Sequence, residues 1–167
     1  LMLTPLRAWA ATDSDELIAA STKDRKREVY YRTADRVSAL PGQAGDMGYF
    51  PLADGNMLAI DLTTGNLIGG ANILWRSTVG GLMDHPPLVT RNAVYASGEN
   101  SGVARVDRTT GKVLWKTEGS ADTLLGSTDD FVYVRNNQGR MLLYDARQVL
   151  DPSVGRVRPL TGVDLPA

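Results

Sequence analysis

One recurring spacing constrains the fold of this chain more than any other feature. In three segments an aromatic residue is followed twelve positions later by an aspartate, with a glycine between the two. The pairs are Tyr49 and Asp61, Tyr95 and Asp107, and Tyr133 and Asp145, with Gly55, Gly102 and Gly139 between them. Self-similarity at a fixed period is the signature of a repeat architecture.

The period of the repeat indicates a propeller blade. Asp107 and Asp145 are 38 residues apart, whereas Asp61 and Asp107 are 46 apart. The longer spacing contains six extra residues, because Trp75 lies ten positions after the Thr-Thr-Gly glycine of its copy while Trp115 lies four after its own. Without this insertion the period is about 40 residues, within the range of propeller blades.

An earlier and weaker copy precedes these three. Trp9 stands at the place of the aromatic residue that starts the other copies, and we assign Tyr31 to the place of their tryptophan. The sequence therefore predicts a single propeller segment over 1–167, with four repeats at about 6–36, 37–79, 80–119 and 120–158.

Each copy has the pattern of a small antiparallel sheet. Alternating stretches rich in β-branched and aromatic residues are separated by Asp-Gly, Ser-Gly and Thr-Gly turns. The preceding segments HPPLVT (85–90) and TLLGS (123–127) each supply one more, innermost strand. The predicted fold is an all-β propeller of about four blades, each a four-stranded antiparallel sheet, within a larger ring of about seven or eight blades.

The repeated residues are interpreted as structural, because a catalytic group is not needed three times around a ring. We expect the aspartates to cap the following turn by accepting backbone N–H bonds. We expect the tryptophans to fill the space between stacked blades, with each indole N–H bound to a backbone acceptor. The structural positions are Asp61, Gly65, Trp75, Asp107, Gly111, Trp115 and Asp145.

The third copy, VYASGENSGVARVDRTTGKVLW, resembles the pyrroloquinoline-quinone-type propeller repeat, with consensus V-Y-V-G-S-x-D-G-x-L-Y-A-L-D-x-x-T-G-x-x-x-W. The second copy keeps the Asp-Gly turn, Ala59, Asp61 and Thr64-Gly65. The fourth keeps Val132-Tyr133-Val134, Gly139 and Leu143-Tyr144-Asp145, but lacks the Thr-Gly and the tryptophan. The resemblance covers about residues 6–147.

The resemblance implies one of two functional classes. One is the quinoprotein dehydrogenases, which have a quinone cofactor, a calcium ion and a catalytic aspartate on an eight-bladed propeller. The other has no cofactor and is similar to the outer-membrane assembly scaffold of the bacterial periplasm. The chain has no cysteine, so the vicinal cysteine pair of many such dehydrogenases is absent, and four repeats are half of their ring. We therefore expect a scaffold without catalytic, cofactor-binding or metal residues, located in the periplasm or otherwise outside the cytoplasm.

Three other groups of residues carry chemistry in principle. Asp13, Asp15 and Glu16 form an acidic turn that offers oxygen ligands to Ca²⁺, but acids between strands usually mark a solvated hairpin. His85 is the only histidine and has no sequence partners for a triad or a zinc site. A basic stretch is diluted by acids and is interpreted as blade packing around Tyr30 and Tyr31; its cations are Lys23, Arg25, Lys26, Arg27, Arg32 and Arg36.

Charge and hydropathy restrict the partners. The chain has 18 basic and 19 acidic residues, so no net field favours nucleic acid. No apolar run approaches the ~20 residues of a transmembrane segment. We expect a protein partner, and either further blades of a longer protein, a second copy of the chain or closure of the four blades on themselves to complete the ring. The alternative functions are a fragment of a quinone-dependent dehydrogenase and a carbohydrate-binding propeller.

Overall fold

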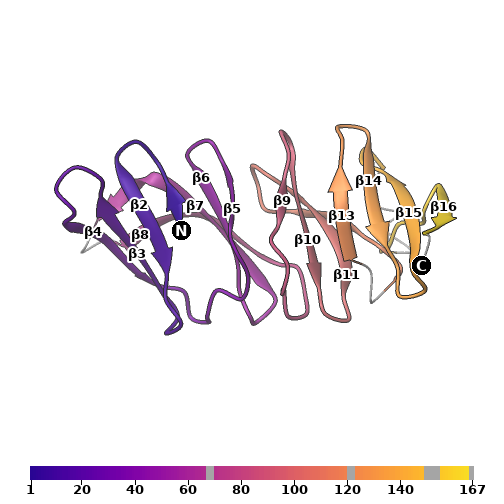
Figure 1. Cartoon of the computed structure of the whole chain (residues 1–167), viewed down its shortest axis with the longest axis horizontal. Coiled ribbons are helices and arrows are strands. Elements are labelled where there is room, and N and C mark those ends of the chain that lie inside the picture. The colour runs from indigo at the N-terminus through magenta and orange to yellow at the C-terminus, as the bar shows by residue number, and fades with distance from the viewer. Residues whose placement is uncertain (67–69, 120–122, 149–154, 166–167) are drawn as a thin grey trace.

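The computed structural model describes residues 1–66, 70–119, 123–148 and 155–165, whose strands form four antiparallel sheets (Figure 1). Each sheet has four strands in chain order, so each is a simple meander. These ranges contain no helix, and hence none of the length and apolarity needed to cross a membrane. The predicted all-β fold, with four blades of four antiparallel strands, is confirmed.

The blades are defined by their strands. The first blade contains β1 (Met2–Leu3), β2 (Arg7–Ala11), β3 (Glu16–Ser21) and β4 (Arg27–Arg32). The second contains β5 (Gly42–Ala44), β6 (Met47–Pro51), β7 (Asn56–Asn66) and β8 (Gly70–Thr78). The third contains β9 (Leu88–Val89), β10 (Ala93–Gly98), β11 (Gly102–Asp107) and β12 (Val113–Lys116). The fourth contains β13 (Thr123–Ser127), β14 (Phe131–Arg135), β15 (Arg140–Asp145) and β16 (Thr161–Asp164).

The segments HPPLVT and TLLGS supply first strands, as the sequence predicts. β9 lies within the former and pairs with β10, and β13 is the whole of the latter and pairs with β14. One of the predicted limits of the repeats, the start of the fourth at residue 120, lies outside the described ranges.

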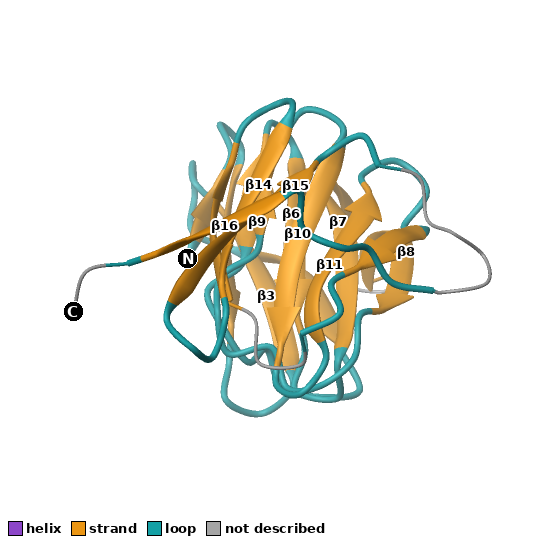
Figure 2. Ribbon diagram, turned by 90° about the vertical axis from the view of Figure 1, so that its right-hand side faces the viewer, coloured by secondary structure: helices purple, strands orange, loops and turns teal. Residues whose placement is uncertain are grey.

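The blades stack face to face in a row from the N-terminal to the C-terminal end (Figures 1 and 2). Three apolar clusters hold them, one between each pair of successive blades. In each cluster, side chains from one face of a blade pack against side chains from the facing side of the next blade. We call the face of a blade toward the next one its trailing face and the face toward the previous one its leading face.

Strand register corrects one sequence assignment. Ala19 pairs with Trp9 on one side and with Val29 on the other, while the equivalent Ala59 pairs with Tyr49 and Trp75. Val29 therefore takes the tryptophan position of the first blade, and the assignment of Tyr31 to it is wrong. Each of these blades has a register shift next to this row, and a spacing counted along one strand does not detect such a bulge.

The row does not close on itself. The first and fourth blades lie at opposite ends (Figure 1), and no apolar cluster of the described residues joins them. Closure of four blades into a small ring, one of the alternatives raised by the repeat count, is therefore wrong.

The fourth blade ends differently from the others. In the first and third blades a tight turn joins the last two strands, whereas β15 and β16 are separated by residues 146–160. Part of this connection lies against the third blade, where Val157 is buried and bridges Thr117 in parallel. Arg156 donates from Nη1 to the Thr117 carbonyl at 2.9 Å. The connection therefore covers part of the edge of the third blade.

Candidate functional site

The repeated aspartates bind their own turns. Asp61 accepts the backbone N–H of Thr63 at 2.9 Å and the hydroxyl of the same residue at 2.6 Å. Asp107 accepts backbone N–H bonds from Thr109 at 3.0 Å and Thr110 at 2.8 Å. Asp145 accepts the backbone N–H of Arg147 at 2.7 Å. Each carboxylate thus organises the turn that follows its strand.

The hydrogen bonds also set the acidity of two of these groups. Bonds from the backbone N–H and hydroxyl of Thr110 lower the pKa of Asp107 below its ordinary value. Partial burial by itself raises the pKa of Asp61, but the bonds from Thr63 and Thr64 outweigh it and leave that pKa lowered. Both groups are therefore held as carboxylates at neutral pH.

A pH dependence of stability follows for Asp107. A carboxyl whose pKa is lower in the folded state stabilises that state above the unfolded pKa of about 3.9, and this contribution disappears as the pH falls through the folded pKa. We expect Asp107→Asn to lower the urea midpoint at pH 7, with the difference from the wild type shrinking toward pH 3. Exposed Glu99→Gln is the control and should leave that pH dependence unchanged. An Asp107→Asn difference that stays constant from pH 7 to pH 3 would contradict this assignment.

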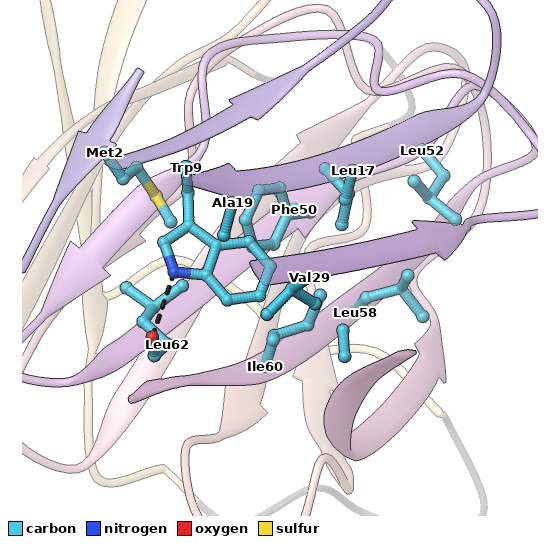
Figure 3. Close-up of a cluster of buried hydrophobic side chains, with 11 residues drawn as sticks. Met2, Trp9, Leu17, Ala19, Val29, Phe50, Leu52, Leu58, Ile60 and Leu62 are labelled. Carbon is cyan, nitrogen blue, oxygen red and sulfur yellow. Dashed lines mark hydrogen bonds between the residues drawn. The ribbon is translucent and has the colours of Figure 1, made fainter. Parts of the chain in front are cut away.

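Two tryptophans bind the equivalent turn of the next blade. The Trp75 indole donates from Nε1 to the Arg108 carbonyl at 2.9 Å, and the Trp9 indole donates to the Leu62 carbonyl at 2.9 Å (Figure 3). Both acceptors directly follow the repeated aspartate of their blade. Trp9 lies on the second strand of its blade, whereas Trp75 lies on the fourth strand of its own. The tryptophan thus comes from a different strand in the two blades, but its indole binds the same turn of the next blade.

The third tryptophan packs without such a bond. Trp115 is fully buried, and its ring centroid lies 5.9 Å from that of Tyr95 and 6.1 Å from that of Tyr144. Among the described residues its Nε1 has no acceptor. The expectation that each indole finds a backbone carbonyl is therefore right for Trp75 and wrong for Trp115.

The glycines of the Thr-Thr-Gly turns have left-handed backbones. Gly65 has φ 96° and Gly111 has φ 73°. At Gly111 a β-carbon would lie 2.7 Å from Cδ2 of Trp75, so the ring of one blade rests directly on the turn of the next. A side chain at this position is disfavoured both by the backbone angle and by the contact.

Two arginines clamp neighbouring blades, and the sequence gives no sign of either role. Arg7 donates to the carbonyls of Thr63, Thr64 and Gly65 in the second blade and pairs with Glu28 at 2.8 Å. Arg108 of the third blade donates from Nε to the Tyr49 hydroxyl of the second blade at 2.9 Å. Neither position repeats as arginine in every copy, so periodicity does not identify them.

The acidic turn does not form a ligand set. Glu16 accepts the Tyr30 hydroxyl at 2.8 Å, Asp15 lies 4.0 Å from Arg32, and Asp13 accepts the Ser14 hydroxyl at 3.2 Å. Within the described ranges, no three His, Cys, Asp or Glu residues are arranged to hold a metal ion.

His85 and the basic stretch also have local partners. The exposed His85 ring lies 2.6 Å from Asp84 in the loop before β9. Arg27 lies 5.7 Å over the ring of Tyr30, and Lys26 lies 3.9 Å from Asp24. The cations of this stretch therefore alternate with acids and aromatic rings.

A cleft of about 400 Å³ opens between the first two blades. Trp9 and Phe50 line it, but both are nearly fully buried, so neither offers an open ring face to a sugar. Asp13 and Arg36 also line the cleft. The cleft therefore has a mixed polar and apolar lining and does not provide an aromatic platform.

A family model described as "Outer membrane protein assembly factor BamB" matches residues 70–147. The matched stretch runs from β8 to just beyond β15 and is similar to the pyrroloquinoline-quinone-like repeats of that family. No curated protein matches the chain significantly.

Several solved structures are similar to the chain in fold. BamB from Moraxella catarrhalis superposes with a TM-score of 0.71 at 14% identity, over 99% of this chain and 49% of that one. A quinohemoprotein alcohol dehydrogenase, ADHIIG from Pseudomonas putida HK5, gives 0.64 at 12% identity, over 98% of this chain and 33% of that one. The computationally designed Ika8 protein gives 0.67 at 15% identity, over 98% and 48%. The chain thus spans about half the length of BamB and Ika8, and these likenesses concern the fold.

Proposed function

We propose that this chain is a non-enzymatic scaffold that binds another protein. The observation that carries the proposal is the use made of its repeated polar residues. Asp61, Asp107 and Asp145 each bind a turn of their own blade, and Arg7 and Arg108 bind the neighbouring blade. These groups make the row of blades rigid and are not directed together at one point.

A rigid row of blades suits the presentation of loops. The turns between the second and third strands of successive blades lie at one end of the strands, and the turns between the third and fourth strands lie at the other. Loops held by a rigid frame are the usual location of binding residues. The match to an assembly-factor model supports a protein as the ligand. We propose a bacterial, periplasmic location on the same basis.

The alternative is a fragment of a quinone-dependent dehydrogenase, which the likeness to ADHIIG favours. The quinone and calcium of that class need several oxygen ligands converging on one site. The repeated aspartates lie on three different blades, and each carboxylate is bound to its own turn. The described residues do not fit such a site.

Photo-crosslinking tests the scaffold proposal. A benzophenone side chain is placed at Asn137, between β14 and β15, or at Asp24, between β3 and β4, which are turns at opposite ends of the strands. We expect a discrete protein adduct in a periplasmic extract from one of the two positions, with the other position as the matched control. Adducts from neither position, or equal unspecific labelling from both, would contradict a loop-mediated partner.

A further inference from the structure

Among the described residues, no blade packs against two faces of the row, the leading face of the first blade and the trailing face of the fourth. Both are predominantly apolar. Their side chains occupy repeat positions whose equivalents in the other blades are covered by a neighbouring blade. The cause of their exposure is therefore their place in the row rather than a different composition.

The leading face of the first blade consists mainly of alanines, with Ile18 and Leu3 as its larger apolar residues. Ala8 pairs with Ala20 and Ala10 pairs with Ile18, and all four alternate away from the buried Trp9. All four are half-buried, and Leu3 beside Ala8 is 58% exposed. At the same positions in the later blades the residues are nearly all fully buried; they are Gly48, Phe50, Leu58, Ile60, Val94, Ala96, Ala104, Val106, Val132, Val134, Leu142 and Tyr144.

The trailing face of the fourth blade carries larger apolar groups. Tyr133 pairs with Leu143, and Met141 of the same face pairs with Val163. The first three are half-buried and Val163 is 56% exposed. The equivalents of Tyr133 in the earlier blades, Trp9, Tyr49 and Tyr95, are all buried at 2% exposure or less. Within the part of the chain that the structure describes, this face therefore lacks the cover that the other three blades have.

The two faces match each other in the way that covered faces do. Between the second and third blades, Ala59 of the trailing face and Ala104 of the leading face lie in one cluster, and these are the positions of Leu143 and Ile18. Large side chains on one free face thus oppose small ones on the other. At equivalent hairpins, the exposed Arg135 ends β14 on the trailing face, and Glu16, which is partly buried and accepts the Tyr30 hydroxyl, begins β3 on the leading face.

We propose that two copies of this chain bind each other through these faces and close one ring. The trailing face of the fourth blade of each copy would cover the leading face of the first blade of the other. Such a head-to-tail contact closes into a ring when the rotation per copy divides a full turn. Four blades account for about half of two similar propeller chains, so two copies would supply a whole ring.

The molar masses of the wild type and of two variants with opposite introduced charges test this proposal. The 167-residue chain should elute in light-scattering chromatography with twice its own 18.0 kDa. Ile18→Lys introduces a charge on one face and Leu143→Glu introduces the opposite charge on the other. Each variant alone should be a monomer, since both contacts of the ring then carry a buried unpaired charge.

Mixing the two variants should restore the dimer. In that pair one contact is wild type and the other places the introduced lysine opposite the introduced glutamate, so both contacts are satisfied. Leu74→Lys is the control, since Leu74 is 45% exposed on β8 and lies on neither face, and it should remain dimeric. Retained β-sheet circular dichroism shows that each variant is folded. A monomeric wild type, an open series of larger assemblies, or no dimer on mixing would overturn the proposal.

Discussion

Replacing Trp9 by alanine is expected to lower the free energy of unfolding by about 3–5 kcal/mol, the usual cost of removing a buried tryptophan. The Trp9 ring is 1% exposed and lies in the cluster between the first two blades (Figure 3). Its removal leaves a cavity and also an unpaired Leu62 carbonyl, which now accepts the indole N–H. Urea unfolding followed by circular dichroism measures the change.

Trp9→Phe separates the two contributions. Phenylalanine keeps most of the apolar contact but cannot donate to Leu62, so a smaller loss of about 1–3 kcal/mol is expected. A loss below about 1 kcal/mol for Trp9→Ala would contradict the role of this ring in joining the blades.

Gly111→Ala is expected to destabilise the chain by about 2–5 kcal/mol, from two causes that add. The backbone at φ 73° disfavours any β-carbon by about 1–2 kcal/mol. The new methyl group would also lie 2.7 Å from the Trp75 ring, and such overpacking costs about 1–3 kcal/mol more. Chemical denaturation gives the total.

Gly139→Ala is a matched control for the backbone contribution. Gly139 has φ 78°, close to that of Gly111, but a β-carbon there meets nothing within 4 Å. Gly139→Ala should therefore cost only the backbone contribution of about 1–2 kcal/mol. In a Trp75→Ala background the added cost of Gly111→Ala should fall to that of Gly139→Ala, because the clash is removed. Equal costs for both glycines in the wild-type background would show that Trp75 does not rest on the turn.

The sequence predicts the blades well because their strands and turns are local. The interval from Tyr95 to Asp107 spans one hairpin, so its length is set by the two strands and the turn between them. The bond from Asp107 to its own turn is likewise a contact between residues two and three apart. Such features repeat whenever the hairpin repeats.

Contacts between blades are less visible in the sequence. The bulge beside Ala19 shifts Val29, not Tyr31, into the row of Trp9, and no spacing along the chain records this shift. Arg7 joins carbonyls more than fifty residues away, and arginine does not recur there in every copy. The free faces are not visible in the sequence for another reason. The second and third strands of each blade carry apolar residues on both faces, so the pattern does not tell which face lacks a neighbour.

The fourth blade shows where a repeat pattern fails. The fourth blade lacks the Thr-Thr-Gly turn and the tryptophan that the second and third blades have, and β16 follows a connection of residues 146–160. It pairs with β15 through four residue pairs from Thr161 to Asp164. The strand is specified by this pairing, which a search for a repeated motif does not detect.

The central claim is that the repeated residues of this chain build and join blades and do not hold a redox cofactor. Its most direct test is titration of the chain with pyrroloquinoline quinone at saturating Ca²⁺ by calorimetry and absorbance, followed by dye-linked oxidation of alcohols and sugars. A quinone-dependent dehydrogenase of the ADHIIG type serves as the positive control. We predict neither a saturable heat nor a quinone-dependent rate. Saturable binding with turnover that is lost in Asp107→Asn without a change in thermal stability would contradict the account.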